Sequence, residues 1–191
     1  MSKSRLEAFS DAILAIVMTI MVLELTAPPG SDIASLRPLL PKLLSYTLSF
    51  LFLAIYWVNH HHLFQAVERV NGAVLWANVG LLFWLSLVPF VTAWAGDNGA
   101  KPVPVAIYGA ILLLAAIAYF ILVRTLLAVH PSGSQLANAI GRDVKGKVSV
   151  LIYAVAIPTS FLSTIVGWSL YVAVALVWLV PDRRIESTLR S

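Results

Sequence analysis

Long apolar runs alternate with short polar groups along this 191-residue chain. A run of about 20 apolar residues has the length of a helix that crosses a lipid bilayer. The pattern predicts six such helices, at about Leu6–Leu25, Leu43–Phe64, Ala73–Ala95, Val103–Leu127, Val148–Leu162 and Thr164–Val180. The expected fold class is therefore an all-α integral membrane protein with six transmembrane helices.

Groups of turn-forming residues mark most of the boundaries between these helices. They lie at residues 27–30, 71–72, 96–99 and 130–134, and they are rich in proline, glycine, asparagine and serine. Only the last boundary is open. The segment Val148–Val180 holds either two spans joined by a tight turn near Ser163–Gly167 or one long, strongly tilted helix.

The composition supports a single membrane domain over residues 1–191. Hydrophobic residues make up 60% of the chain and charged residues 12%, and the mean hydropathy is +0.88. Such a composition excludes a water-soluble domain. Although the formal net charge is +4, the basic residues lie between apolar runs, where they orient a membrane protein rather than bind nucleic acid. Without cysteine, the chain has neither disulfides nor thiolate metal sites.

The distribution of lysine and arginine predicts the orientation. With six spans, ten of the thirteen basic residues share one side of the membrane: Lys3, Arg5, Arg69, Arg124, Arg142, Lys145, Lys147, Arg183, Arg184 and Arg190. The other side holds Arg37, Lys42 and Lys101. Because basic residues favour the cytoplasmic side, both termini are expected in the cytoplasm.

The first predicted helix carries a carboxylate near each end. Asp11 and Glu24 are 13 residues apart, which corresponds to about 20 Å of helix, whereas the hydrocarbon layer is about 30 Å thick. One of the two therefore lies at or near membrane depth, where an ionisable group faces protein or water and is a functional candidate. Alternatively, the two carboxylates mark the interfaces of a thinned or tilted region.

A motif in this helix resembles a known family. Residues 5–11, Arg-Leu-Glu-Ala-Phe-Ser-Asp, match the Arg-x-x-x-Phe-Ser-Asp motif that opens the first helix of the endosomal and lysosomal potassium channel family and its prokaryotic homologues. Six predicted spans and an aromatic and histidine cluster at residues 56–62 extend the resemblance. The length is similar to that of a prokaryotic member with one six-helix unit.

The resemblance implies a homotetramer in a prokaryotic cell membrane, with helix 1 of each subunit lining a central pore for potassium and other monovalent cations. The Thr-Val-Gly-Tyr-Gly filter of ordinary potassium channels is absent from the sequence. In the family, large apolar residues of helix 1 constrict the pore, and here these positions are Ile16, Ile20 and Leu23. Their spacing of four and three places them on one helical face. Without the resemblance, such a stripe predicts core packing.

Thr19 lies next to that face and is a candidate ion-coordinating residue, since its hydroxyl can contact a partly dehydrated cation. A threonine in a membrane helix more commonly bonds its own backbone. The motif residues Arg5, Phe9, Ser10 and Asp11 are expected in a polar network with the end of helix 2, which offers Trp57, Asn59, His60 and His61. Arg5 is a candidate to pair with an aspartate of its own or a neighbouring subunit and to anchor the helix at the cytoplasmic interface, and the two roles are compatible.

A metal site at His60, His61 and His62 is disfavoured, because consecutive helical residues point about 100° apart. We instead expect one or two of these histidines to donate hydrogen bonds to Ser10 or Asp11, and the third to be solvated. A pair formed by Asp11 and a helix 2 histidine is also the basis of an alternative function, a proton-conducting or proton-coupled transporter.

The sequence thus predicts a potassium-permeable channel that conducts passively, without a cofactor or metal. A structural membrane protein without transport is a third possibility. No catalytic residues are expected, because no nucleophile and base arrangement or nucleotide-binding glycine loop is present.

Overall fold

The computed structural model describes residues 2–131, 134–140 and 144–179. In these ranges the chain forms helices only: α1 (Lys3–Leu23), the 3-10 helix η1 (Ile33–Leu39), α2 (Leu40–Gln65), α3 (Gly72–Ser86), α4 (Val88–Asn98), α5 (Pro102–Ala128), α6 (Gln135–Ile140), α7 (Val144–Thr159) and α8 (Thr164–Leu179). The all-α fold class is confirmed.

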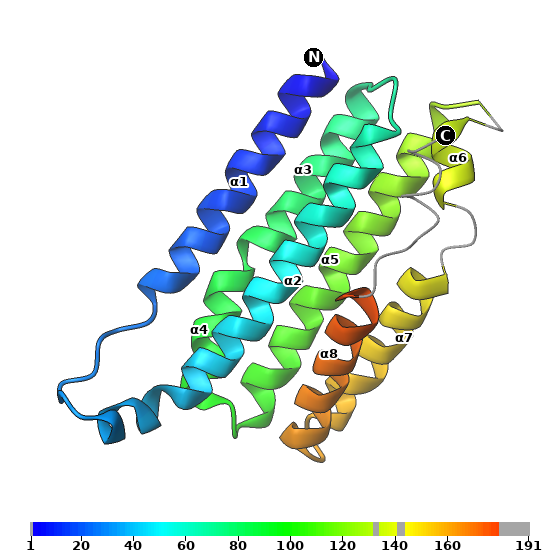
Figure 1. Ribbon diagram of the computed structural model, residues 1–191. Coiled ribbons are helices and arrows are strands. Elements are labelled where there is room, and N and C mark those ends of the chain that lie inside the picture. Colours follow the sequence, from blue (N-terminus) through cyan, green and yellow to red (C-terminus); the bar gives the residue numbers. More distant parts are fainter. Residues whose placement is uncertain (1, 132–133, 141–143, 180–191) are drawn as a thin grey trace.

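Helices α1, α2, the α3–α4 pair and α5 run side by side as an elongated bundle (Figure 1). Four stretches are long and apolar enough to cross a membrane: Lys3–Leu23, Ile33–Gln65, Gly72–Asn98 and Pro102–Ala128. Helices α7 and α8 complete the six predicted helices. They have 16 residues each, or about 24 Å, which is shorter than the hydrocarbon layer.

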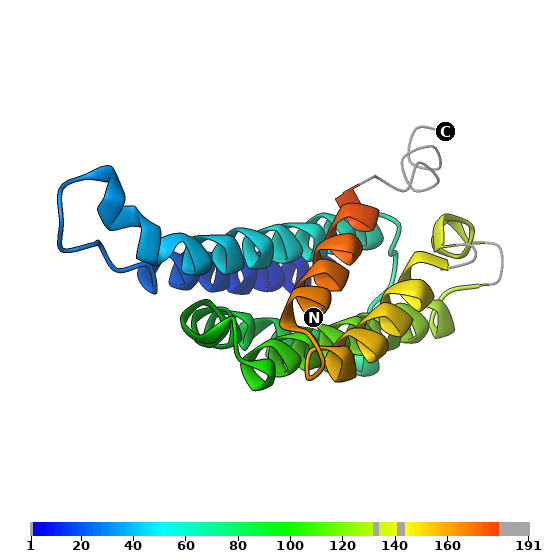
Figure 2. The ribbon, with the colours of Figure 1, turned by 90° about the horizontal axis from the view of Figure 1, so that it is seen from below.

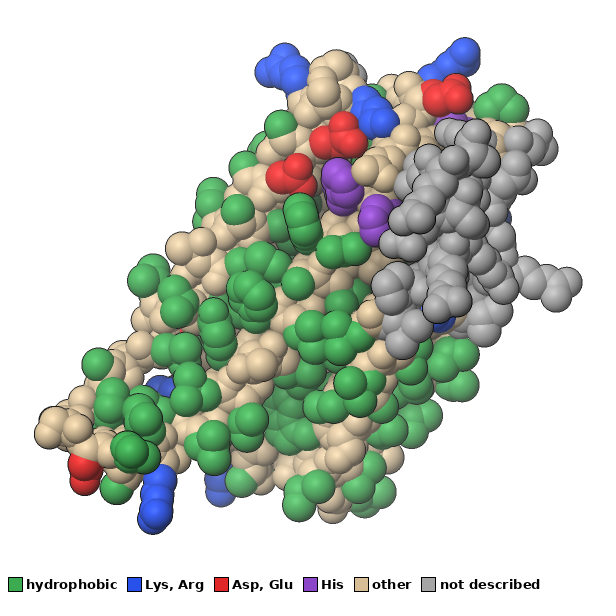
Figure 3. Space-filling model, in the orientation of Figure 1, with side chains coloured by type: hydrophobic (Ala, Val, Ile, Leu, Met, Phe, Trp, Pro, Cys, Tyr) green, Lys and Arg blue, Asp and Glu red, His purple; other side chains and the backbone are tan. Residues whose placement is uncertain are grey.

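Charged side chains gather at the two ends of the bundle, and the face between them is largely apolar (Figure 3). The N-terminus lies at one end, together with the connection from α2 to α3 (Figure 1). At this end a buried histidine, His130, links the end of α5 to the connection between α2 and α3. His130 Nδ1–H donates to Leu126 O (2.8 Å), while Nε2 accepts from the backbone N–H groups of Glu68 (3.0 Å) and Arg69 (3.3 Å). Charged ends with an apolar face between them are what a membrane-embedded bundle shows.

The third predicted helix is in fact two. Its expected range, Ala73–Ala95, is interrupted at Leu87, between α3 and α4. Pro89 lies in the first turn of α4 and has no N–H to bond the preceding turn. The Leu87 N–H instead donates to Trp84 O at 3.2 Å. The correction is local, because α4 continues the direction of α3 across the bundle (Figure 1).

The open question at the end of the chain is resolved in favour of two helices. Residues 160–163 form the turn between α7 and α8, a few residues before the predicted Ser163–Gly167. The Ser163 N–H donates to Thr159 O at 2.8 Å and closes the turn. The two helices then return side by side as a hairpin, which Figure 2 shows from below.

A buried hydroxyl cluster joins α2, α4 and α5 inside the core. Thr92 Oγ1 lies 2.7 Å from Ser49 Oγ, which is 2.9 Å from the hydroxyl of Tyr108. The next residue of α5, Gly109, allows close approach of α8, since a Cβ there would overlap the Tyr171 hydroxyl. In a membrane, where burial of apolar surface gives little drive between helices, such contacts hold the bundle together.

Candidate functional site

Helix α1 has one buried face and one exposed face. The buried face packs on α2, α3 and α4, and its fully buried residues are Leu6, Ser10, Leu14, Val17 and Met21. The exposed face carries the three predicted constriction residues. Ile16 is 56% exposed, Leu23 is 73% exposed, and Ile20 is also exposed.

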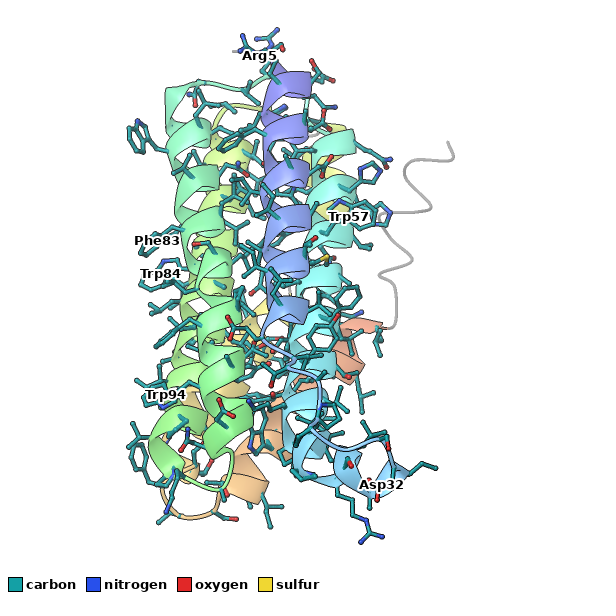
Figure 4. The ribbon with its side chains drawn as sticks, turned by 90° about the vertical axis from the view of Figure 1, so that its left-hand side faces the viewer. Arg5, Asp32, Trp57, Phe83, Trp84 and Trp94 are labelled. Carbon is teal, nitrogen blue, oxygen red and sulfur yellow. The ribbon has the colours of Figure 1, made fainter. Side chains whose placement is uncertain are left out.

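No helix of the described chain covers this exposed face. In Figure 4, α1 lies in front of α2 and the α3–α4 pair, and its outer side is open to the viewer. An edge helix with a row of large apolar side chains needs lipid or another protein surface against it. The row is therefore a candidate contact surface for further copies of this chain.

Thr19 is exposed on the same side of α1. Its hydroxyl donates to Ala15 O at 2.7 Å, a bond to the preceding turn of the same helix. The hydroxyl proton is thus already used, while the oxygen keeps lone pairs that point out of the bundle. Thr19 can offer an oxygen ligand to a cation but not a further proton.

A continuous chain of hydrogen bonds links α1 to α3 and α2 inside the bundle. Ser10 Oγ donates to Leu6 O at 2.9 Å and accepts from Asn78 Nδ2 at 2.9 Å. Asn78 Oδ1 lies 2.8 Å from His60 Nε2. All three polar side chains are buried. Because water cannot reach them, these hydrogen bonds are what satisfies their polar atoms.

This arrangement assigns the proton on His60. Because the Asn78 amide nitrogen donates to Ser10, its oxygen is the acceptor, and His60 Nε2 must carry the hydrogen. The imidazole ring also stacks on Phe64, with 4.5 Å between ring centroids. The orientation of the His60 ring is thus set by its hydrogen bond to Asn78 and its contact with Phe64.

Asp11 is held separately, by the indole of Trp57. Trp57 Nε1 donates to Asp11 Oδ1 at 3.0 Å, and the Trp57 ring stacks on His61 with 6.0 Å between centroids. His61 Nε2 in turn lies 2.9 Å from the side-chain nitrogen of Gln65. Trp57 is 43% exposed, so this second group lies at the surface of the bundle, as its position in Figure 4 also shows.

Other predicted members of the network lie apart from these bonds. Asn59 Nδ2 donates within its own helix, to Ile55 O at 2.7 Å, and its backbone oxygen accepts from Tyr119. Among the described residues, Arg5 makes no ion pair; Lys42 with Asp97 is the pair found there. Phe9 points outward and is about half exposed.

Asn78 is the member that our sequence analysis missed. It is the sole amide in the apolar run from Val74 to Ser86, and a lone polar side chain in such a run must find a partner inside the bundle. The lone amide in an apolar run was therefore the sequence signal for this residue.

Within the described part of the chain, no group of three acidic, histidine or cysteine side chains forms a metal site.

Comparison with known proteins places this geometry in a family. The family model described as the endosomal/lysosomal potassium channel TMEM175 matches residues 5–89, which include most of α1, all of α2 and α3, and the start of α4. A potassium channel from Chryseobacterium sp. (strain P1-3) is 50% identical over 190 residues, which cover 100% of this chain and 99% of that protein.

A solved structure and a human protein extend the comparison. The crystal structure of a lysosomal potassium-selective channel TMEM175 homolog from Chamaesiphon minutus has a TM-score of 0.83 and 28% identity, covering 93% of this chain and 96% of that one. The human endosomal/lysosomal proton channel TMEM175 is 35% identical over 99 residues, which are 46% of this chain and 19% of that protein. With these matches, the chain belongs to the endosomal/lysosomal potassium channel TMEM175 family.

Proposed function

We propose that this chain forms a potassium-permeable channel of a prokaryotic cell membrane, in which residues 1–191 are one six-helix subunit of a homotetramer with both termini in the cytoplasm. Passive conduction along a central axis then needs no cofactor and no catalytic group. The names of the bacterial relatives, a potassium channel and a potassium-selective channel homolog, support this activity.

The observation that carries the pore assignment is the uncovered face of α1. Ile16, Ile20 and Leu23 share that face and are exposed in the single chain. A single helix cannot enclose a path for ions, so copies related by a cyclic axis are needed to bring several α1 helices together. Four copies are the arrangement that the family resemblance implies.

In such an assembly the Ile16, Ile20 and Leu23 side chains form apolar rings around the axis. A narrow apolar ring excludes water and ions unless the helices separate, and it thereby acts as a gate and a constriction in place of a carbonyl filter. Thr19, between Ile16 and Ile20 along the chain, offers the oxygen ligand nearest to these rings. Potassium, which loses its hydration shell at lower cost than sodium, is then the favoured ion.

The second candidate function is proton conduction. Its support is the human relative, whose name is proton channel, together with the buried histidine at position 60. The human protein is much longer than this chain, which covers 19% of it. In the described structure the His60 proton is engaged by Asn78 at 2.8 Å, away from the exposed face of α1. Potassium conduction therefore remains the preferred proposal.

The decisive experiment is ion flux from liposomes that contain the purified full-length protein. A potassium gradient, a sodium gradient and a pH gradient are imposed in separate preparations. The channel proposal expects potassium release that sets a potential close to the potassium equilibrium value. Flux only in response to the pH gradient would support the proton-conducting alternative, and impermeable liposomes would indicate a structural protein.

A further inference from the structure

A large apolar cavity lies on the opposite side of α2 from the pore-lining candidates. Its volume is about 310 Å³, and its walls come from α2, α5, α7 and α8. This volume lies within the range of small-molecule pockets, about 300–1,000 Å³. None of its lining residues belongs to α1, so the cavity is separate from the proposed conduction path.

The helices that surround the cavity differ in length. Helices α2 and α5 have 26 and 27 residues, or about 40 Å, whereas α7 and α8 reach only about 24 Å. The turn of the hairpin lies at the end of the bundle far from the N-terminus, and its other end, where α7 begins and α8 ends, stops short of the ends of α2 and α5 (Figure 1). The lining residues of the hairpin belong to this end of it, since they come from Gly146–Tyr153 of α7 and from Trp178 of α8.

The depth of the cavity corresponds to one leaflet of the bilayer. Asn59, at one edge of the cavity, is six residues before the end of α2, and Phe52 is 13 residues before it. These positions lie about 9 Å and about 20 Å below the end of the helix. The cavity thus begins near the polar boundary of the membrane and extends toward its centre.

Basic and aromatic residues surround the part of the cavity formed by α7 and α8. Lys147 lies in the first turn of α7, lines the cavity and has an exposed side chain. Trp178, from the last turn of α8, donates to Ser149 Oγ at 2.7 Å, and Lys145 Nζ lies 6.0 Å from the centre of its ring. Lysine and tryptophan are the residues that contact lipid headgroups at membrane interfaces.

We propose that this cavity is a binding site for a phospholipid with an anionic headgroup. One acyl chain occupies the apolar space between α2 and α5, alongside Phe52 and Ala116. The phosphate lies against Lys147, whose flexible side chain extends toward the interface. The positive charge at the mouth favours an anionic lipid over a zwitterionic one, and this preference distinguishes the site from a nonspecific apolar surface.

The test is lipid binding to the delipidated, detergent-purified full-length protein, followed by native mass spectrometry. The two probes are dioleoyl-phosphatidylglycerol, which is anionic, and dioleoyl-phosphatidylcholine, which is zwitterionic. Wild-type protein is expected to bind phosphatidylglycerol preferentially. Lys147→Gln should weaken phosphatidylglycerol binding about fivefold and leave phosphatidylcholine binding unchanged, since one interfacial lysine contributes about that factor.

Ala116→Trp fills the cavity and should reduce the binding of both lipids at least about tenfold. The matched controls are Lys101→Gln and Ala73→Trp, because both positions lie outside the cavity lining, and both are expected to bind like wild type. Equal binding of the two lipids by wild type, or unchanged binding by Lys147→Gln, would overturn the proposal. Loss of the oligomer in Ala116→Trp with lipid binding retained would instead identify a subunit contact, and would also overturn it. None of these readouts depends on ion conduction.

Discussion

Asn78 Nδ2 donates to Ser10 Oγ at 2.9 Å, and this bond fixes the rotation of α1 about its own axis. Ser10 faces into the bundle, toward α3. Ile16 follows six residues later and is therefore turned by about 240° from Ser10, at about 100° per residue. A buried hydrogen bond near one end of α1 thus determines which side chains its outer face presents.

Replacing Asn78 with alanine should loosen this anchoring. The change leaves the His60 Nε2–H group buried without its acceptor and removes the donor to Ser10. An unpaired buried group costs about 1–3 kcal/mol, so the melting temperature of the detergent-solubilised protein should fall. Asn98→Ala is the control, because in the described part of the chain the Asn98 side chain donates within its own helix, to Trp94 O. Equal melting temperatures for the two variants would contradict this role of Asn78.

Asp11 and Trp57 are expected to act as one unit. Asp11→Ala and Trp57→Phe each remove the 3.0 Å bond between them, so each should lower stability by about 1 kcal/mol, and the double variant should be little worse than either. Asp11→Asn keeps an acceptor oxygen and should be milder. Size-exclusion profiles and melting curves measure the effect. An Asp11→Ala protein that assembles and melts like wild type, yet conducts poorly, would place Asp11 in the pore instead.

The comparison of Asn59 with Asn78 shows how far sequence reasoning reaches at this site. Each is the single amide of its predicted apolar run, Leu43–Phe64 and Ala73–Ala95 respectively, and both must bond inside the bundle. Which of them contacts α1 depends on the rotation of α2 and α3 about their axes. That rotation is determined by how each helix packs against all of its neighbours. The motif near Ser10 identified one end of the network, but the bridging residue depended on tertiary structure.

The fold, too, was predictable from the sequence in part. Apolar length predicted the helices, and the turn residues between them predicted most of their ends. Pro89 was a visible signal for the interruption between α3 and α4, although a proline early in a helix is also compatible with continuation. The cavity beside Phe52 had no sequence signal, because its walls come from helices that are distant in the chain.

The oligomeric state can be measured directly. If α1 lines an axial pore, native mass measurement of the conducting preparation should give about four times the chain mass of 20.8 kDa. The apolar face of α1 would then be covered by other subunits rather than by detergent. A monomer mass in a preparation that demonstrably conducts potassium would exclude the central-pore arrangement.

Glu24 should influence conduction electrostatically. It is the residue after Leu23 and forms the C-cap of α1, so a cyclic assembly places several carboxylates around one mouth of the pore. Such a ring concentrates cations, and the effect is screened by salt. Glu24→Gln should therefore reduce potassium flux at low ionic strength and have little effect at high ionic strength. Asp32→Asn, in the neighbouring loop, is the control and should leave both values unchanged; an identical loss in that variant would indicate a nonspecific surface charge effect.

Ile16 and Val17 provide the sharpest test of the constriction, because they are adjacent, yet one is exposed and the other is buried in the bundle. Ile16 is 56% exposed and Val17 is 4% exposed in the single chain. In the proposed tetramer, Ile16→Asn replaces an apolar ring with a wettable one, so basal flux should rise and the preference for potassium over sodium should decrease. Ile16→Met keeps an apolar side chain of similar volume and should change conduction much less.

Val17→Asn should behave differently, since it buries an amide without a partner inside the subunit. We expect a lower melting temperature and no increase in flux. Liposome flux for both ions, measured beside melting curves for the three variants, separates pore lining from packing. If Ile16→Asn instead lowers stability with unchanged or reduced flux, then Ile16 is a packing residue, and the constriction has to be sought at Ile20 or Leu23.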